Sequence, residues 1–427
     1  MNRNTESFAI NNFKELKVQM LNWANQFNIC TFLDNHQYHT KHNSVECLLA
    51  VDAIQIINAS KNSLHQLKDF CSTQKDWLFG HVGYDFKNYI EPLTSKHPDG
   101  IQFSDFFFFQ PNTVVELKQN EIIISSVDNN PIEIFEEIKQ QPIVNTYYKA
   151  PIINFQPKID KQEYLTIINK LKEHLQRGDC YEINFCQEFF AENIAIDALA
   201  TYNKLVDISP NPFSCFYKME DKYLLCASPE RYVKKEGTTI ISQPIKGTYK
   251  RNLLNPITDN ANKIALQQST KDKSENVMVV DLVRNDLSKI CKQGSVVVEE
   301  LFGVYTFPQV HQMISTVKGI VNDDVDFADV LKATFPMGSM TGAPKKRVME
   351  LIEQYEQTKR GIYSGCVGYI NPQQDFDFNV VIRSLLYNST NKYLSYQVGG
   401  GITFYSNAEN EYEECLLKAE AMKKVFE

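Results

Sequence analysis

The sequence predicts a large α+β protein with mainly antiparallel sheets covered by helices. Short apolar runs typical of strands alternate irregularly with helix-like stretches of ten or more residues. This order lacks the regular βα rhythm of a parallel, doubly wound sheet. With 427 residues, 43% of them hydrophobic and 22% charged, the chain can bury a large core or form two to three ordinary domains.

The composition and charge exclude several classes of protein. The net charge is −8 at pH 7, whereas a nucleic-acid-binding surface needs clustered basic residues. No apolar run approaches the roughly 18 residues of a membrane-spanning helix, and the first residues show no apolar segment typical of a signal peptide. The ten cysteines are scattered without a C-x-x-C pair, which argues against structural zinc. We therefore expect a cytoplasmic protein with reduced thiols and with no nucleic-acid or membrane partner.

Changes in composition divide the chain into three predicted parts. Residues 1–126 form an N-terminal subdomain in which strand-like runs mix with short helices. Prolines and asparagines accumulate over residues 127–158, which predicts an irregular connecting segment. Residues 159–427 form the second and larger domain, intertwined with the N-terminal part.

Individual elements follow from local signals. The aromatic run 106–109 predicts a buried strand that ends at Pro111. Asp160 and Glu163 form a D-x-x-E capping box and Gly178 supplies a stop, so a helix is expected between them. Further strands are expected at 180–188, 223–227, 238–241, 365–370, 379–385 and 394–398. Further helices are expected at 259–269, 273–290, 326–333, 345–357 and 408–426.

Two acidic pairs lie three residues apart on predicted helices. Asp272 with Glu275, and Glu411 with Glu414, would each share one helix face. Brought together, the two faces would offer four carboxylates, the hard oxygen ligands that Mg²⁺ prefers. The alternative is solvated helix surface. Lys418 lies one turn after Glu414, where an ordinary ion pair is the simplest interpretation.

Two glycine-rich segments are suited to a ligand. Residues 338–345 lead into a predicted helix, whose free N-terminal amides can bind an anion. Gly399, Gly400 and Gly401 close a predicted strand, where missing side chains let a ligand approach the backbone. Neither spacing is a nucleotide-binding phosphate motif, and tight turns without a ligand are the alternative.

Four single side chains could carry chemistry. Lys246 follows an apolar run, between a proline and a glycine, and is either a solvated surface charge or a buried amine. Glu230 follows a proline, where burial would suit a general acid, although a plain turn is the alternative. His311 lies in an apolar strand as a core residue or a catalyst. Arg383 ends an apolar strand and needs a carboxylate, from the protein or from a ligand.

The order of six motifs carries more information than any one of them. They are residues 178–185 (GDCYEINF), 228–231 (SPER), 244–248 (PIKGT), 281–287 (DLVRNDL), 338–344 and 411–418. The set resembles the chorismate-utilising enzymes, which include anthranilate synthase component I, aminodeoxychorismate synthase component I, and the isochorismate and salicylate synthases. The resemblance is strong over residues 155–425 and weak in the N-terminal third. It implies an orthogonal sandwich of large antiparallel sheets flanked by helices.

The resemblance also implies roles for the residues that match the family's motifs. Glu275 and Glu414 would bind Mg²⁺ directly, and Asp272 and Glu411 would hold its waters. The substrate carboxylates would be bound by Tyr363, Arg383, Lys418, Gly399, Gly400 and Gly401, and the ring pocket would be lined by Thr248. Glu230 would assist loss of the C4 hydroxyl, and His311 would be the active-site histidine. Chorismate is a dianion with a poor leaving group, so a metal, cations and an acid suit its chemistry.

Lys246 discriminates between members of this family. Anthranilate synthases resemble the surrounding segment but usually carry a small residue there, whereas aminodeoxychorismate synthases carry lysine. The resemblance to the latter implies that the amine adds at C2 as the C4 hydroxyl leaves, and that ammonia at C4 then displaces the enzyme. Such a lysine must be substantially deprotonated, through burial or nearby cations such as Mg²⁺ and Lys418. Glu182 departs from the glutamine common in amine-transferring relatives.

The expected activity is therefore an Mg²⁺-dependent aminodeoxychorismate synthase of the component I kind, making 4-amino-4-deoxychorismate for p-aminobenzoate and folate. The sequence contains no G-x-C-x-G nucleophile elbow, so ammonia is expected from a separate glutamine amidotransferase subunit. A lyase would act afterwards. The alternatives are anthranilate synthase component I and a non-catalytic chorismate-binding subunit.

Overall fold

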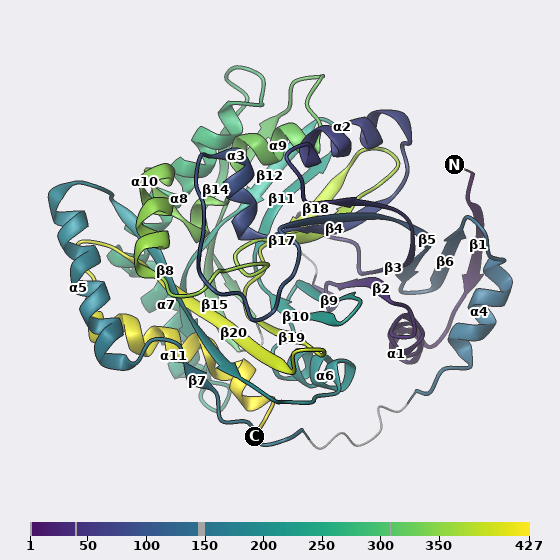
Figure 1. Cartoon of the computed structure of the whole chain (residues 1–427), viewed down its shortest axis with the longest axis horizontal. Coiled ribbons are helices and arrows are strands. Elements are labelled where there is room, and N and C mark those ends of the chain that lie inside the picture. Colours follow the sequence, from purple (N-terminus) through teal and green to yellow (C-terminus); the bar gives the residue numbers. More distant parts are fainter. Residues whose placement is uncertain (1, 39–40, 144–149, 308) are drawn as a thin grey trace.

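The chain folds into antiparallel sheets with helices packed around them (Figure 1). The computed structural model describes residues 2–38, 41–143, 150–307 and 309–427. Every pairing between its described strands is antiparallel. The predicted α+β class with mainly antiparallel sheets is confirmed.

The elements alternate irregularly along the chain, as the sequence predicts. The first part contains β1 (Asn4–Ala9), α1 (Phe13–Ala24), β2 (Ile29–Asp34), β3 (Cys47–Asn58), α2 (Ser63–Thr73), β4 (Leu78–Val82), the short helix η1 (Tyr84–Phe86), α3 (Lys87–Ile90), β5 (Phe106–Lys118), β6 (Glu121–Ser126), α4 (Pro131–Lys139), β7 (Gln156–Pro157), α5 (Lys161–Arg177), β8 (Glu182–Ala191), α6 (Ala198–Ile208), β9 (Phe213–Met219) and β10 (Lys222–Ser228). The second part contains β11 (Arg231–Glu236), β12 (Thr239–Gln243), β13 (Ile245–Lys250), α7 (Pro256–Gln268), α8 (Thr270–Ser288), β14 (Val297–Thr306), β15 (Val310–Ile320), α9 (Phe327–Thr334), the short helix η2 (Gly338–Met340), β16 (Gly342–Ala343), α10 (Lys345–Tyr355), β17 (Cys366–Ile370), β18 (Phe376–Asn379), β19 (Ser384–Asn388), β20 (Tyr393–Ile402) and α11 (Ala408–Lys424).

The strands form two hydrogen-bonded series that share β3 and β5. One series runs β1–β6–β5–β3–β2–β9–β10–β19–β20–β8, with β7 and β16 on β8. The other runs β3–β5–β4–β17–β18–β11–β12–β15, with β13 and β14 also on β15. Because β3 and β5 belong to both series, the N-terminal strands hold the two together.

Residues 1–126 are built into the same sheets as the rest of the chain. Strand β2 pairs with β9, and β4 pairs with β17, so strands far apart in sequence lie side by side (Figure 1). The predicted connecting segment 127–158 contains α4 and β7, and its residues 144–149 lie outside the described part of the chain. The N-terminal part therefore depends on strands of the larger part for its pairing.

Two predicted strand limits are wrong. Strand β5 does not end at Pro111, because its pairing with β3 shifts register opposite this residue, and a bulge tolerates the missing N–H. The single strand predicted at 379–385 is broken into β18 and β19. Between them the chain leaves the sheet, and Arg383 adopts the left-handed backbone region with φ 54°. Such a conformation at a residue other than glycine is costly and is frequent at functional sites.

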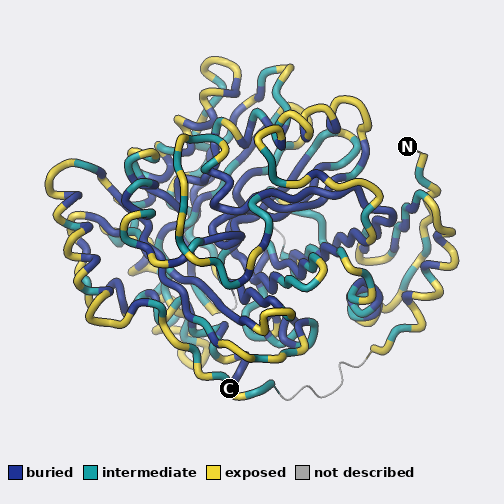
Figure 2. Tube along the Cα trace, in the orientation of Figure 1, coloured by how far each residue is buried: buried dark blue, intermediate teal, exposed yellow. Residues whose placement is uncertain are grey.

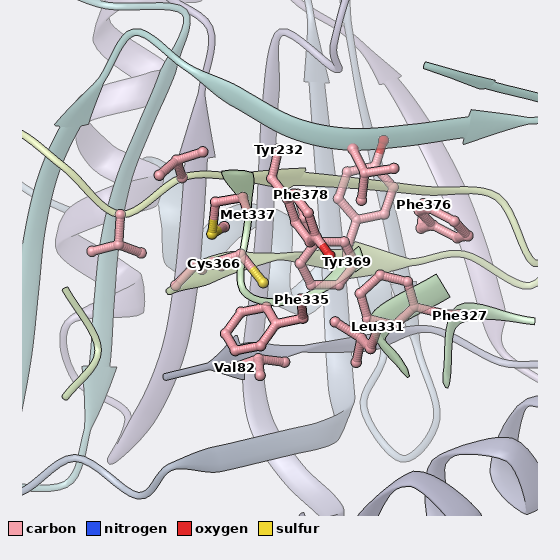
Figure 3. Packing of buried hydrophobic residues seen from close by; sticks show 14 of the residues in the cluster. Val82, Tyr232, Phe327, Leu331, Phe335, Met337, Cys366, Tyr369, Phe376 and Phe378 are labelled. Carbon is pink, nitrogen blue, oxygen red and sulfur yellow. The ribbon is translucent and has the colours of Figure 1, made fainter. Parts of the chain in front are cut away.

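The core is rich in aromatic side chains. Figure 2 shows that the central strands are buried, whereas the outer helices and loops carry most of the exposed chain. In one cluster Phe327 stacks on Phe378 with ring centroids 4.2 Å apart, and Phe376 packs beside them (Figure 3). None of the helices in the described ranges combines the length and the apolar character needed to cross a bilayer.

Three helices position the functional site. Helix α5 begins where the Asp160 side chain accepts a hydrogen bond from the Glu163 N–H, and Gly178 ends it, as predicted. Helix α8 packs against β13 and β15, and α11 packs against β20 and α5. The acidic pairs predicted on α8 and α11 are therefore carried by helices that pack on different series of strands.

Candidate active site

A cavity of about 580 Å³ lies between β13, β20, α8 and α11, beside the turn that joins β10 to β11. The predicted site residues that line it are Glu230, Lys246, Thr248, Asp272, Glu275, Tyr363, Arg383, Gly399, Gly400, Gly401, Glu414 and Lys418. These residues come from seven separate parts of the sequence, so the fold gathers almost the whole predicted set around one space.

Two predicted residues do not line the cavity. His311 is buried on β15, where Nδ1 lies 3.0 Å from Thr306 Oγ1 and Nε2 lies 3.1 Å from Asp259 Oδ1. Because side chains alternate along a strand, its neighbour Gln312 faces the cavity instead. This position does not support the predicted catalytic role of His311. Glu411 is buried behind Gly400, whose added Cβ would lie 3.3 Å from Glu411 Oε2.

Lys246 is placed by an irregularity in β13. The pairing of β13 with β15 shifts register between Ile245 and Thr248, which turns the Lys246 side chain to the cavity. Gly247 has φ 87°, and a Cβ there would lie 2.9 Å from Asp272 Oδ1. A glycine is therefore required for the backbone to pass α8 at this point.

The surroundings of Lys246 hold it as an ammonium ion. Its side chain is 10% exposed, and Nζ donates a hydrogen bond of 2.5 Å to Glu182 Oε1. Burial lowers the pKa of Lys246, but the carboxylates of Glu182, Glu275 and Glu230 outweigh it and raise the pKa overall. The chain's own groups therefore favour the ammonium ion, so burial alone does not deprotonate this amine, and the contribution expected of Mg²⁺ stays a prediction.

Glu230 lies in the tight turn between β10 and β11. Ser228 Oγ donates to the Val380 carbonyl at 2.6 Å, and the Val380 N–H donates to the Glu230 carbonyl at 3.0 Å. These two hydrogen bonds fix the turn to the segment that follows β18. Burial raises the pKa of the Glu230 carboxyl to about 7, although Ser339 and Lys246 oppose the shift. A carboxyl that is about half protonated at neutral pH is suited to act as a general acid.

The two acidic pairs come together across α8 and α11. Lys271 Nζ lies 3.8 Å from Glu275 Oε1 and 3.4 Å from Glu411 Oε1. Glu275 Oε1 is buried without a hydrogen-bond partner, and burial raises the pKa of this carboxyl to about 7. Over the described ranges no three His, Cys, Asp or Glu side chains close around a common metal position. Two direct carboxylate ligands completed by water would still fit Mg²⁺, and the unpartnered oxygen of Glu275 suits a cation.

Arg383 and Lys418 supply cationic groups to the same cavity. Arg383 Nη1 donates to the Lys418 carbonyl at 3.0 Å, and this side chain forms no ion pair within the described ranges. Lys418 Nζ donates to the Gly399 carbonyl at 2.9 Å and lies 2.7 Å from Glu414 Oε1, which confirms the predicted ion pair. Lys418 lowers the pKa of Glu414 to about 2. Since no protein carboxylate takes the Arg383 guanidinium, a carboxylate on a ligand is its natural partner.

Several residues near the cavity were not predicted from the sequence. Gln312, Asn184 and Ser339 contribute polar groups to its lining. Glu182 lies behind Lys246 and is 2% exposed. Glu182 gave a sequence signal as a departure from the glutamine of similar enzymes. Asn184 and Ser339 lie in two of the six motifs but were given no role, and Gln312 lies in an ordinary strand pattern.

Comparison with known sequences gives a consistent match. Residues 21–424 match the protein family described as chorismate binding enzyme. A probable chloroplastic aminodeoxychorismate synthase of Oryza sativa is 37% identical over 306 residues, which are 71% of this chain and 32% of the rice protein. Aminodeoxychorismate synthase component 1 of Bacillus subtilis is 29% identical over 85% of this chain and 78% of its own length. The chain thus spans about a third of the rice protein and most of the bacterial one.

A solved structure shares the fold. The crystal structure of anthranilate synthase component I from Streptococcus pneumoniae superposes with a TM-score of 0.76 and 25% sequence identity. The match covers 91% of this chain and 94% of that structure. The architecture is therefore common to both over nearly their full lengths.

Proposed function

Because the chain belongs to the chorismate-binding enzyme family, we propose that it is an aminodeoxychorismate synthase component I, which converts chorismate and ammonia to 4-amino-4-deoxychorismate. The observation that carries this proposal is the position of Lys246. Its amine faces the cavity together with Glu230, an acid with a pKa of about 7. A nucleophile and an acid on one cavity are what a two-step replacement of a hydroxyl needs.

We expect Arg383 and Lys418, the cationic side chains discussed above, to bind the substrate. The two carboxylates of chorismate would be held by Arg383 and Lys418, by the Tyr363 hydroxyl and by the backbone of Gly399 to Gly401, all of which line the cavity. Arg383 is fixed through a backbone carbonyl rather than a carboxylate, so its other N–H groups remain for the ligand. This arrangement would orient the ring between Lys246 and Glu230.

The reaction then proceeds in two substitutions. Lys246 Nζ, as the neutral amine, forms a bond to C2, the ring double bonds shift to C1=C6 and C4=C5, and the C4–O bond breaks. Glu230 donates its proton to the departing hydroxyl, which leaves as water. Ammonia then forms a bond at C4, the double bonds shift back, and the bond from C2 to Lys246 breaks. The carboxylate of Glu230 takes up the proton released by the new amine.

Magnesium is the expected metal. Glu275 and Glu414 would hold the ion directly, with Asp272 and Glu411 binding its waters, because these carboxylates meet between α8 and α11. The ion would neutralise a substrate carboxylate and the surrounding acidic groups. The burial and unpartnered oxygen of Glu275 support this assignment.

Ammonia would come from a partner. We propose a glutamine amidotransferase subunit as its source, because the Bacillus subtilis relative is named component 1 of its synthase, with ammonium salts replacing the subunit in vitro. Nothing lining the cavity suggests removal of the enolpyruvyl group, so a lyase would act on the product.

Product identification tests this proposal. The purified protein is incubated with chorismate, MgCl₂ and ammonium salt, and the products are separated and identified by mass and fluorescence. We expect 4-amino-4-deoxychorismate. Formation of anthranilate without an added lyase would instead indicate an anthranilate synthase, and unchanged chorismate would indicate a non-catalytic subunit.

A further inference from the structure

The Glu182 side chain is buried next to the Lys246 amine and does not line the cavity. It is the first residue of β8, and its backbone pairs with Ala343 of β16. Its side chain is 2% exposed, Oε1 accepts the 2.5 Å hydrogen bond from Lys246 Nζ, and Oε2 is buried without a hydrogen-bond partner. An ionised carboxylate with one unused oxygen is costly to bury, so the pair is not explained as a stabilising core contact.

The fold leaves space for this pair. A Cβ on Gly401 would lie 2.7 Å from both Glu182 Oε1 and Lys246 Nζ. A Cβ on Gly342 would lie 2.0 Å from the Glu182 carbonyl, so β16 also approaches β8 through a glycine. Gly401 therefore leaves the room that the contact between carboxylate and amine needs, and Gly342 lets β16 pair closely with the backbone of Glu182.

The charged groups around Lys246 favour its protonated form, whereas the proposed reaction needs the neutral amine. The other charged groups that line the cavity are Glu230, Lys271, Asp272, Glu275, Arg383, Glu413, Glu414 and Lys418. The net effect of the carboxylates raises the pKa of Lys246, so the resting amine carries a proton that it must lose before it can form a bond. Only Glu182 touches Nζ among the residues that the structure describes.

We propose that Glu182 positions the Lys246 amine and accepts its proton when substrate is bound. The inference rests on the proposed function, in which this amine is the nucleophile. The proton moves from Nζ to Oε1, the electron pair that it leaves on nitrogen forms the bond to C2, and the C4 hydroxyl departs with the proton of Glu230. When ammonia has displaced Lys246, the neutral amine takes its proton back from Glu182.

The pH profile separates this role from that of a simple counter-ion. With Glu182 as acceptor, proton loss from Lys246 needs no exchange with solvent, so this step adds no pH dependence to the rate beyond that of Glu230. In Glu182→Gln the proton must leave to solvent, and below pH 7, where Glu230 keeps its proton, the rate then rises about tenfold per pH unit. A counter-ion would have the opposite effect, because its removal frees the amine at neutral pH.

The experiment compares the wild type with Glu182→Gln, Glu182→Asp and the control Glu188→Gln, a buried carboxyl on the same strand outside the cavity. We expect kcat of Glu182→Gln to fall about 100-fold at pH 7, with little change in KM and with a rise of about tenfold per pH unit below pH 7. Glu182→Asp should keep the wild-type pH profile at a lower rate, and Glu188→Gln should match the wild type.

Two outcomes overturn the inference, and a further variant separates it from the proposed function. Glu182→Gln with the wild-type rate at every pH, or with a higher rate at pH 7, would remove Glu182 from the proton path. If Glu182→Gln does not fold, a steeply pH-dependent rate in Glu182→Asp would contradict the inference instead. Lys246→Ala with full activity would refute the covalent function itself, whereas an inactive Lys246→Ala beside an unaffected Glu182→Gln would refute the role of Glu182 alone.

Discussion

Glu230 shows how a single side chain acquires a function from its surroundings. Its carboxyl would ionise well below neutrality in water, but burial in the turn after β10 raises its pKa to about 7. The acid is needed in its protonated form, so activity should be retained at lower pH and decline as the pH rises through about 7. The same carboxyl at a solvated turn would be ionised and of no use as an acid.

Replacement of Glu230 by glutamine tests this role. Glutamine keeps the size of the side chain but cannot donate a proton to a leaving group, so we expect kcat to fall by about 10²–10⁴. The decline of the remaining activity near pH 7 should disappear. The measurement is the rate of 4-amino-4-deoxychorismate formation from pH 5 to 9. An unchanged alkaline limb in Glu230→Gln would assign the titration to another group.

Glu275 should behave as a metal ligand rather than as a structural acid. Its unpartnered buried oxygen predicts that Mg²⁺ stabilises the wild type, by about 2.7 kcal/mol at a hundredfold excess over the dissociation constant. Glu275→Ala should lose this stabilisation and its Mg²⁺-dependent turnover. Thermal unfolding with and without MgCl₂ measures the effect. The control is Asp281→Ala, an exposed acid on α8, and an equal Mg²⁺ shift in both variants would exclude Glu275.

At the scale of elements, the glycine segment of β20 lines the cavity with backbone and without side chains. Its three consecutive glycines face β8 on one edge and the cavity on the other. A Cβ on Gly401 would meet the amine of Lys246 at 2.7 Å, whereas a Cβ on Gly400 would meet nothing nearer than 3.3 Å. Gly401 therefore lies closer to Lys246 and Glu182 than Gly400 does to its own neighbours. The sequence pattern does not distinguish the two glycines.

This difference predicts unequal effects of two similar substitutions. Gly401→Ala should displace the contact of Lys246 with Glu182 and lower kcat/KM by on the order of a hundredfold. Gly400→Ala should have a smaller effect, because its neighbours need to move by only a few tenths of an ångström. Steady-state kinetics on both variants, with melting temperatures as a check on folding, gives the comparison. Equal losses would contradict the proposed geometry.

At the scale of the whole molecule, the N-terminal third is part of the scaffold of the site. Strands β2 and β4 pair with β9 and β17, and β3 and β5 belong to both series of strands. Residues 159–427 alone would expose these edges and the apolar faces behind them. We expect this fragment to aggregate or to unfold without a cooperative transition. A monomeric fragment with one sharp thermal transition, measured by size exclusion and circular dichroism, would contradict the interdependence.

The comparison of sequence and structure follows the same scales. Helices with strong caps, such as the one between Asp160 and Gly178, and the strands of the catalytic part could be predicted because their signals are local. The strand through Pro111 and the break before Arg383 could not, since both depend on a partner strand. Within the site, motif order identified the residues that meet, but the orientation of His311 away from the cavity is set by strand register.

The same limit applies to electrostatics. The sequence left open whether Lys246 is buried and did not show which groups surround it. The carboxylates of Glu182, Glu230 and Glu275, which only the three-dimensional arrangement brings to this amine, raise its pKa instead of lowering it. Their combined effect explains why the proposed nucleophile rests as a cation.

The most direct test of the account is the detection of Lys246 bound to substrate. The enzyme is mixed with chorismate and MgCl₂ without any source of ammonia, quenched, digested and examined by mass spectrometry. We predict that the peptide with Lys246 gains the mass of chorismate less one water, and that ammonium added before the quench removes this adduct as product forms. Normal product formation with no adduct on Lys246 at any time would contradict the central claim.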